Sequence, residues 1–157
     1  MHELRRHILK SGGGAALALL LGAGLLRPTR VLAANWNAPA FESKDVAGAL
    51  RGLGAGAAQA QASADLKLDA PEIAENGAVV PLEIVSKIPN TSAIAVLIEK
   101  NPQPLAGHFE FSGPLLPQVS LRVKMAETSM VRVLALAGGK YYSSSKEIKV
   151  TAGGCGG

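Results

Sequence analysis

The chain is poor in cysteine, aromatic residues and long hydrophobic runs. Its single cysteine, Cys155, cannot form an internal disulfide, and with two of the three histidines close to the N-terminus it does not suffice for a structural zinc site. The one long apolar run, residues 15–26, has 12 residues, whereas a membrane-spanning helix needs about 20. A polytopic membrane protein is therefore excluded. Hydrophobic residues still make up 48% of the chain, enough for one core, which argues against a disordered protein.

Residues 1–33 have the features of an export signal. Basic residues precede the apolar run, and Val31-Leu32-Ala33 places small residues where a signal peptidase requires them, so we expect cleavage after Ala33. The segment LRRHILK, residues 4–10, resembles the twin-arginine pattern S/T-R-R-x-F-L-K, with Leu4 at the first position and Ile8 in place of Phe. The leader predicts a periplasmic protein exported by the twin-arginine route, with the general secretory route as the alternative.

Removing the leader changes the charge of the protein. The leader holds five of the 16 basic residues and one of the 12 acidic residues, so the mature chain has eleven of each and a net charge of zero. A neutral chain with few aromatic residues offers no basic field for a phosphate backbone. We therefore expect no nucleic-acid partner, and no membrane association after signal cleavage.

Residues 34–64 predict a leading helix followed by an Ala/Gly-rich linker. Within residues 39–53, Val46, Leu50 and Leu53 recur at the spacing of one helical face. The glycines around Leu53 are expected to end that helix. Residues 57–64 are compatible with either a further helical turn or a loose linker, and the sequence does not decide between them.

Residues 65–151 alternate with a period of two, which is typical of strands. Gln118–Met125 is the clearest case, with Val119, Leu121 and Val123 predicted to face a core. Asn76-Gly77 and Gly138-Gly139 are turn signals. The strands are expected near residues 66–68, 79–88, 94–99, 108–111, 118–125, 130–137 and 140–142, and a last strand is expected to end with Ile148 and Val150 facing the core. About seven short strands predict an all-β fold, an immunoglobulin-like β-sandwich with a leading N-terminal helix.

The last six residues, 152–157, carry the only thiol of the protein. Gly153-Gly154-Cys155-Gly156-Gly157 follows directly on the last strand, and glycines predict a flexible arm. Four residues from Thr151 to Cys155 reach roughly 13 Å when extended. The tail contains no base or cation to lower the pKa of the thiol, which a catalytic cysteine requires. We therefore expect a carrier with no catalytic residue, no metal and no cofactor of its own.

These features together resemble the SoxY family, the sulfur-carrier subunit of the periplasmic thiosulfate-oxidising (Sox) system. The resemblance rests on the terminal Gly-Gly-Cys-Gly-Gly after a strand, on a small exported β-sandwich. It implies that Cys155 holds pathway intermediates covalently and that the chain forms a heterodimer with SoxZ. It also implies transient partners: the cytochrome pair SoxXA attaches thiosulfate, the metal-dependent hydrolase SoxB releases sulfate, and a sulfane dehydrogenase oxidises the remaining sulfur where that enzyme is present.

Two other functions remain open at this stage. One is an exported binding module that dimerises through Cys155. The other is a carrier of the ubiquitin-like type, which uses an adenylated terminal carboxylate after Gly156-Gly157. The second function needs ATP, which an exported chain does not meet.

Several further residues are of types that often have functional roles, but we interpret them as structural. His108 is expected on the surface at a strand end, and Trp36 at an edge or a partner surface. Of Tyr141 and Tyr142, one is expected to pack and the other to face solvent or the partner subunit. Ser143-Ser144-Ser145 is interpreted as a loop, because no Asp/His set accompanies it.

Overall fold

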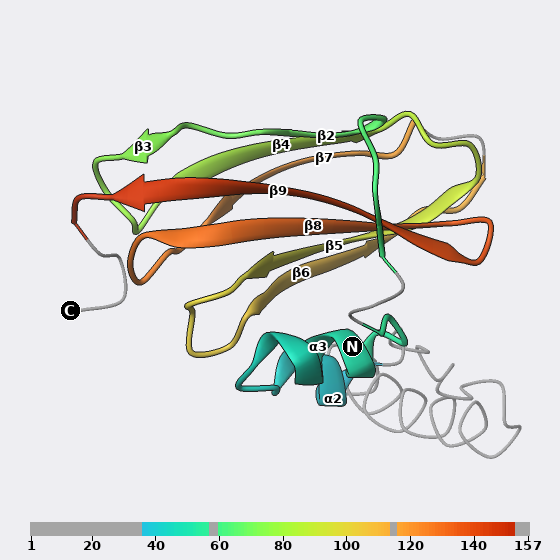
Figure 1. Ribbon diagram of the computed structural model, residues 1–157, viewed down its shortest axis with the longest axis horizontal. Helices are drawn as coiled ribbons and strands as arrows, with labels where there is room; N and C mark the ends of the chain where they lie inside the picture. The colour runs from blue at the N-terminus through green and yellow to red at the C-terminus, as the bar shows by residue number, and fades with distance from the viewer. Residues whose placement is uncertain (1–35, 57–59, 114–115, 153–157) are drawn as a thin grey trace, which may run out of the picture. The chain divides into compact units, whose positions relative to one another are not determined.

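A computed structural model describes residues 36–56, 60–113 and 116–152, and the helices and strands all belong to the unit that begins at Asn37 (Figure 1). The predicted leader, residues 1–33, lies outside the described residues. Two short helices precede nine strands within them. The elements are α2 (Ala38–Phe41), α3 (Val46–Gly52), β1 (Gln61–Ala62), β2 (Leu66–Asp69), β3 (Ile73–Ala74), β4 (Val80–Ser86), β5 (Thr91–Ile98), β6 (Leu105–Glu110), β7 (Gln118–Val123), β8 (Ser129–Ala137) and β9 (Lys140–Val150).

The strands form two sheets, which confirms the all-β prediction. The larger sheet has the order β1-β9-β8-β5-β6, and β3 also pairs with β9; the smaller sheet has the order β2-β4-β7. Strands β5, β6, β8 and β9 pair with one another antiparallel, whereas β1 and β3 lie parallel to β9. Seven strands have four or more residues, as the alternation predicted, and the two additional strands are only two residues long.

The main core lies between the two sheets (Figure 1). In β4, Val80, Leu82 and Ile84 are buried and alternate with the exposed Pro81 and Glu83. Each such side chain contributes about 1.5–3 kcal/mol when it is fully buried. The alternation predicted for Gln118–Met125 is confirmed: Val119, Val123 and Met125 are buried, and Leu121 is half-buried against the same core. A shift of register by one residue would expose these positions, so the core fixes the strand pairing.

The single helix predicted over residues 39–53 is instead two helices. Asn37 caps α2 by accepting a hydrogen bond from the Ala40 amide at 3.2 Å, and Asp45 caps α3 through the Gly48 amide at 2.6 Å. Asp45 has the extended backbone of an N-cap (φ −140°, ψ 158°), which a helix interior does not allow. A capping residue thus interrupts the apolar periodicity that suggested one continuous helix.

The two helices pack closely and cover the outer face of the larger sheet (Figure 1). A Cβ atom at Gly52 would lie 2.5 Å from the Ala40 backbone nitrogen, so the contact between α2 and α3 requires glycine there. Leu50 is buried against Leu97 and Leu134 of the sheet, in a second, smaller hydrophobic cluster. The described part of the chain contains no helix with the length and hydropathy to cross a membrane.

Candidate functional site

The residues predicted to carry the function, Cys155 and the arm glycines Gly153, Gly154, Gly156 and Gly157, lie outside the described residues. The structure describes the chain up to Ala152, and therefore the support from which this tail leaves the sandwich. We call Val150, Thr151 and Ala152 the arm root. How these three residues are held decides where the tail begins.

The final strand is hydrogen-bonded along both edges as it approaches the arm root. On one side β8 pairs with it, with Ser129 opposite Ile148. On the other side β3 runs parallel to it, with Ile73 opposite Lys149 and Ala74 opposite Val150. The Lys149 amide donates to the Glu72 carbonyl oxygen at 2.9 Å. A terminal strand with one open edge would fray easily, and these bonds oppose fraying.

The hydrogen bonding continues past the end of β9. The Val150 amide donates to Thr128 Oγ1 at 2.9 Å, and the Thr151 amide donates to the Ala74 carbonyl oxygen at 3.1 Å. Thr151 Oγ1 donates to the Glu75 carbonyl oxygen at 3.0 Å. The Ala152 carbonyl oxygen accepts from the Gly77 amide at 2.7 Å. The anchored part of the chain therefore extends through Ala152.

This anchoring shortens the reach of the thiol. Cys155 is three residue steps beyond Ala152, and an extended chain gains at most about 3.3–3.6 Å per step, so Cys155 lies within roughly 10 Å of Ala152. The corresponding value from sequence alone, measured from Thr151, was roughly 13 Å. The sequence alone could not predict that Ala152 is anchored, because the hydrogen bond between Gly77 and Ala152 joins backbone groups that are far apart in the chain.

The segment Ile73–Val79, which we call the rim segment, supplies most of the anchoring groups. Its turn is closed by Asn76, whose Oδ1 accepts from the Ala78 amide at 2.8 Å, which confirms the Asn76-Gly77 turn signal. Gly77 is buried, and its carbonyl oxygen accepts from the Met125 amide at 2.7 Å while its own amide holds Ala152. One turn thus joins the arm root to the end of the smaller sheet.

The rim segment also exposes two large apolar side chains. Ile73 is 59% exposed and Val79 is 55% exposed. Among the described residues only Trp36 and Leu116, each 66% exposed, are comparable. Leu116 lies at the opposite end of the sandwich, close to the end of β4, where the Ser86 amide donates to the Pro117 carbonyl oxygen.

Strand β9 contains the tyrosine pair and the three serines considered in the sequence. Tyr141 is the packed tyrosine: its hydroxyl donates to the Leu53 carbonyl oxygen at 2.6 Å, and burial raises the pKa of the phenol. The interpretation of Ser143-Ser144-Ser145 as a loop is wrong, since these residues pair within β9 against Leu134, Val133 and Arg132. Small polar side chains are tolerated there because Ser143 and Ser144 are only half-buried and Ser145 is exposed, on a strand that pairs with β8 along all three serines and with β1 at Ser143.

His108 lies on β6, partly exposed, where it pairs with Ala95. Within the described residues no group of three or more His, Cys, Asp or Glu side chains is placed to hold a metal ion. Trp36, at 66% exposure, is not part of the core, as expected.

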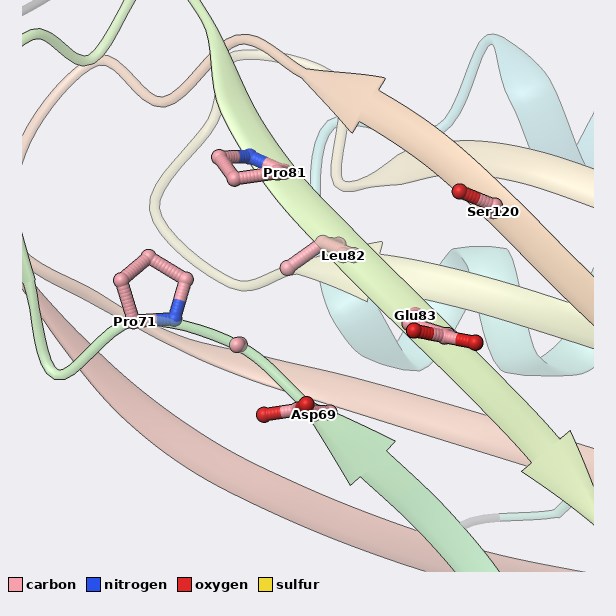
Figure 2. Close-up of a pocket in the computed structure, with 7 residues that line it drawn as sticks. Asp69, Pro71, Pro81, Leu82, Glu83 and Ser120 are labelled. Atoms are coloured by element: carbon pink, nitrogen blue, oxygen red, sulfur yellow. The ribbon is translucent and has the colours of Figure 1, made fainter.

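The outer side of the smaller sheet has a shallow depression, lined by residues of β2, β4 and β7 (Figure 2). Asp69 and Glu83 face each other across the β2–β4 pair, and Ser120 of the neighbouring strand lies beside them. Glu83 is further engaged by Gln118, whose Nε2 donates to it at 2.8 Å. An acidic lining repels anions, so this depression does not suit an anionic ligand.

These observations define a class of protein. It is a β-sandwich in which hydrogen bonds hold the last described strand up to Ala152, and the sequence beyond Ala152 contains the lone cysteine. The family model described as "Sulfur oxidation protein SoxY" matches residues 52–155, so the match ends at Cys155. The chain belongs to the SoxY family.

A solved structure agrees with this assignment. The sulfur carrier protein SoxY from Chlorobium limicola f. thiosulfatophilum is 40% identical, with a TM-score of 0.55 over 59% of this chain and 84% of that one. A superoxide reductase (neelaredoxin) from Ignicoccus hospitalis is 18% identical, with a TM-score of 0.49 over 54% of this chain and 79% of that one. A search of curated proteins finds no match to this chain.

Proposed function

We propose that this chain is a covalent sulfur carrier in thiosulfate oxidation, and that Cys155 holds the intermediates. The observation that carries the proposal is the family match, which extends to the only cysteine of the protein. The name of the 40% identical neighbour, a sulfur carrier protein, supports the same role. The anchored arm root suits it as well, because it holds the start of the tail in one place while Cys155 is presented beyond it.

Loading joins the thiol to thiosulfate. The Cys155 thiol loses its proton, its sulfur forms a bond to the outer sulfur of thiosulfate, and two electrons leave to an acceptor, which we assign to the cytochrome pair SoxXA. The product is an S–S–SO₃⁻ group on Cys155. The carrier supplies only the thiol, while the base and the oxidant belong to the partner enzyme.

Unloading begins with hydrolysis by SoxB. Water attacks the sulfonate sulfur, the S–SO₃⁻ bond breaks, and the products are a persulfide on Cys155 and hydrogen sulfate. Atoms and charge balance without a further reactant. Where a sulfane dehydrogenase is present, it oxidises the remaining sulfane sulfur. The chain therefore acts as the substrate-bearing subunit and not as a catalyst, and it works as a heterodimer with SoxZ.

The proposed compartment is the periplasm, reached by the twin-arginine route. The support is the LRRHILK segment and the cleavage site after Ala33. Replacing Arg5 and Arg6 with lysine is expected to leave the full-length precursor inside the cell, as an immunoblot of cell fractions would show. Normal export of that variant would instead indicate the general secretory route.

The direct test is Cys155→Ala in a reconstituted system of the heterodimer and its partner enzymes. Thiosulfate-dependent electron transfer is expected to fall to the level without carrier. A chain that lacks Gly157 is the matched control, because it retains the thiol and loses the diglycine terminus. Full activity of Cys155→Ala would refute the proposal, and loss of activity only on removal of Gly157 would favour a diglycine carrier.

A further inference from the structure

The turn that holds the arm root contains the dipeptide Asn76-Gly77, whose chemistry is independent of the proposed function. Asparagine is a chemically labile residue, because the amide nitrogen of the next residue can attack its side-chain carbonyl carbon, Cγ. Glycine at the next position has no Cβ atom to obstruct that attack. Asn76 is exposed, so water reaches its side chain. The reactivity of Asn76 therefore depends on how the structure holds the Gly77 amide.

Both reacting groups are hydrogen-bonded in the structure. Asn76 Oδ1 accepts from the Ala78 amide at 2.8 Å, in an Asx turn. This bond draws electron density from Cγ and makes that carbon a better electrophile. The attacking nitrogen belongs to Gly77, and its N–H donates to the Ala152 carbonyl oxygen at 2.7 Å. While the bond to Ala152 is intact, the nitrogen keeps its proton and does not attack.

We propose that Asn76 is a site of spontaneous deamidation, and that the hydrogen bond between the Gly77 amide and Ala152 sets its rate. In the reaction, the Gly77 nitrogen loses its proton and forms a bond to Cγ of Asn76. The bond from Cγ to Nδ2 breaks, and ammonia leaves. Water then opens the resulting succinimide ring at either carbonyl carbon, which gives aspartate or isoaspartate. Atoms balance with water as the only co-reactant.

The isoaspartate product alters the arm root itself. Its main chain runs through the former side chain, so an extra backbone atom lies between residue 76 and Gly77. The Gly77 carbonyl oxygen is held by the Met125 amide at 2.7 Å, so the longer turn displaces the Gly77 amide from Ala152. Release of Ala152 thus permits the reaction, and the reaction makes the release permanent. Ageing of this turn therefore loosens the start of the tail.

Two other asparagines of the sandwich are internal controls. Asn90 is also exposed, but the β-branched Thr91 follows it and hinders attack by the next amide nitrogen. Asn101 precedes Pro102, whose nitrogen carries no proton and cannot close the ring. The full mature chain, purified with any subunit that it binds, is incubated at physiological temperature and pH and mapped by mass spectrometry. Asn76 is expected to lose ammonia before the other two.

Thr151→Val tests the control by the arm root. It removes the hydrogen bond from Thr151 Oγ1 to the Glu75 carbonyl oxygen, keeps a β-branched side chain, and leaves Asn76 and Gly77 unchanged. Deamidation of Asn76 and hydrogen exchange of the Gly77 amide are both expected to accelerate about two- to tenfold, the effect of one lost hydrogen bond on local opening. Ser92→Ala removes a similarly exposed hydroxyl-to-carbonyl bond at the opposite end of the sandwich and should change neither rate.

Thr151→Pro is a stronger variant of the same kind. It also removes the amide that donates to the Ala74 carbonyl oxygen at 3.1 Å. Both rates are expected to rise further than in Thr151→Val. Hydrogen exchange of the buried β5 amides measures unfolding of the whole sandwich, and its contribution is subtracted from the rates at Asn76 and Gly77.

Three results would overturn the proposal. If Asn76 stays intact, or reacts no faster than Asn90, it is not a deamidation site. Faster exchange at Gly77 with an unchanged rate at Asn76 would show that the bond to Ala152 does not control the reaction. Unchanged exchange at Gly77 in both Thr151 variants would show that another group protects that amide. None of these measurements uses thiosulfate, so a failure of the carrier function would leave them unaffected.

Discussion

The two ends of the sandwich are stabilised in different ways. At the far end, β8 and β9 are joined by a two-residue hairpin, where Gly138 (φ 55°) and Gly139 (φ 76°) adopt the left-handed backbone that such a turn requires. At the arm end, β9 ends at Val150, and no further strand follows it within the described residues. The arm end is held instead by groups from Thr128, Glu75 and Gly77.

This difference follows from covalent continuity. A hairpin keeps both of its strands in place because each is connected to the other. The C-terminal end of β9 is not joined by such a turn to a following strand within the described residues, and without other contacts the final residues of a strand fray. In this protein, long-range hydrogen bonds replace the missing turn, and they fix the residue at which the tail begins. The arm end therefore sets the reach of Cys155, whereas the far end only closes the sheet.

The largest effect is expected from shortening the tail between its anchor and the thiol. Deleting Gly153 and Gly154 leaves one residue step from Ala152 to the cysteine, a reach of about 3.5 Å instead of roughly 10 Å. Sulfate release by the hydrolase from the loaded carrier is expected to fall by at least about a hundredfold, because misplacement of the reacting group by ångströms has costs of that order. Alkylation of the free thiol by iodoacetamide should change little.

The matched control deletes Gly156 and Gly157, which removes the same number of glycines beyond the thiol. That chain is expected to retain most of the activity. Near wild-type turnover after deletion of Gly153 and Gly154 would mean that the arm root releases from Gly77 in use, and that the anchored end does not set the reach.

A smaller effect is expected from the side-chain hydrogen bond at the arm root. Thr128→Val removes the acceptor of the partly buried Val150 amide. The free energy of unfolding is expected to fall by about 1–2 kcal/mol, measured by chemical denaturation. Hydrogen exchange at the Val150 amide should accelerate.

The far end offers the comparison. Ser92→Ala removes an exposed bond from Ser92 Oγ to the Leu136 carbonyl oxygen. Its effect should stay within about 0.5 kcal/mol. Equal losses for the two variants would contradict a difference between the ends.

The smallest of the three main effects, control variants aside, is expected at the far end, from Tyr141. Burial raises the pKa of this phenol above its unfolded value of about 10. The neutral form is thus favoured in the folded state, and its contribution is complete below about pH 10 and is lost as pH rises through the raised pKa. Tyr141→Phe removes the hydrogen bond to Leu53, lowers stability at neutral pH by about 1 kcal/mol, and removes this alkaline loss.

Tyr142→Phe is the control, since it leaves the bond between Tyr141 and Leu53 intact. Denaturation curves recorded from neutral to alkaline pH would separate the two variants. The arm root should not follow this pH dependence, because its bonds join backbone amides, carbonyl groups and threonine hydroxyls, none of which titrates. An alkaline loss that persists in Tyr141→Phe would assign it to another group.

The strands of this fold are visible in the sequence because burial of one sheet face imposes a period of two. That pattern located the longer strands and the inward side of Gln118–Met125. It could not reveal β1 and β3, since two residues cannot display a period. Nor could apolar spacing reveal the break before Val46, because the Asp45 cap acts through one hydrogen bond.

The candidate site divides in the same way. A lone cysteine among terminal glycines is a strong local signal, and the proposal that Cys155 carries the sulfur comes from it. The anchoring of Ala152 depends on the Gly77 amide, a backbone group some 75 residues earlier in the chain. It could not be predicted, because every non-proline residue has the same backbone amide. The exposure of Ile73 and Val79 was equally hidden, because both residues are ordinary strand formers.

The most direct test is mass spectrometry of the native protein, isolated from cells that are oxidising thiosulfate and digested without reductant. Covalent carriage predicts that the C-terminal peptide with Cys155 bears sulfane sulfur or a thiosulfonate group, and that a thiol reductant restores the bare peptide. An unmodified peptide throughout active thiosulfate oxidation would contradict the account.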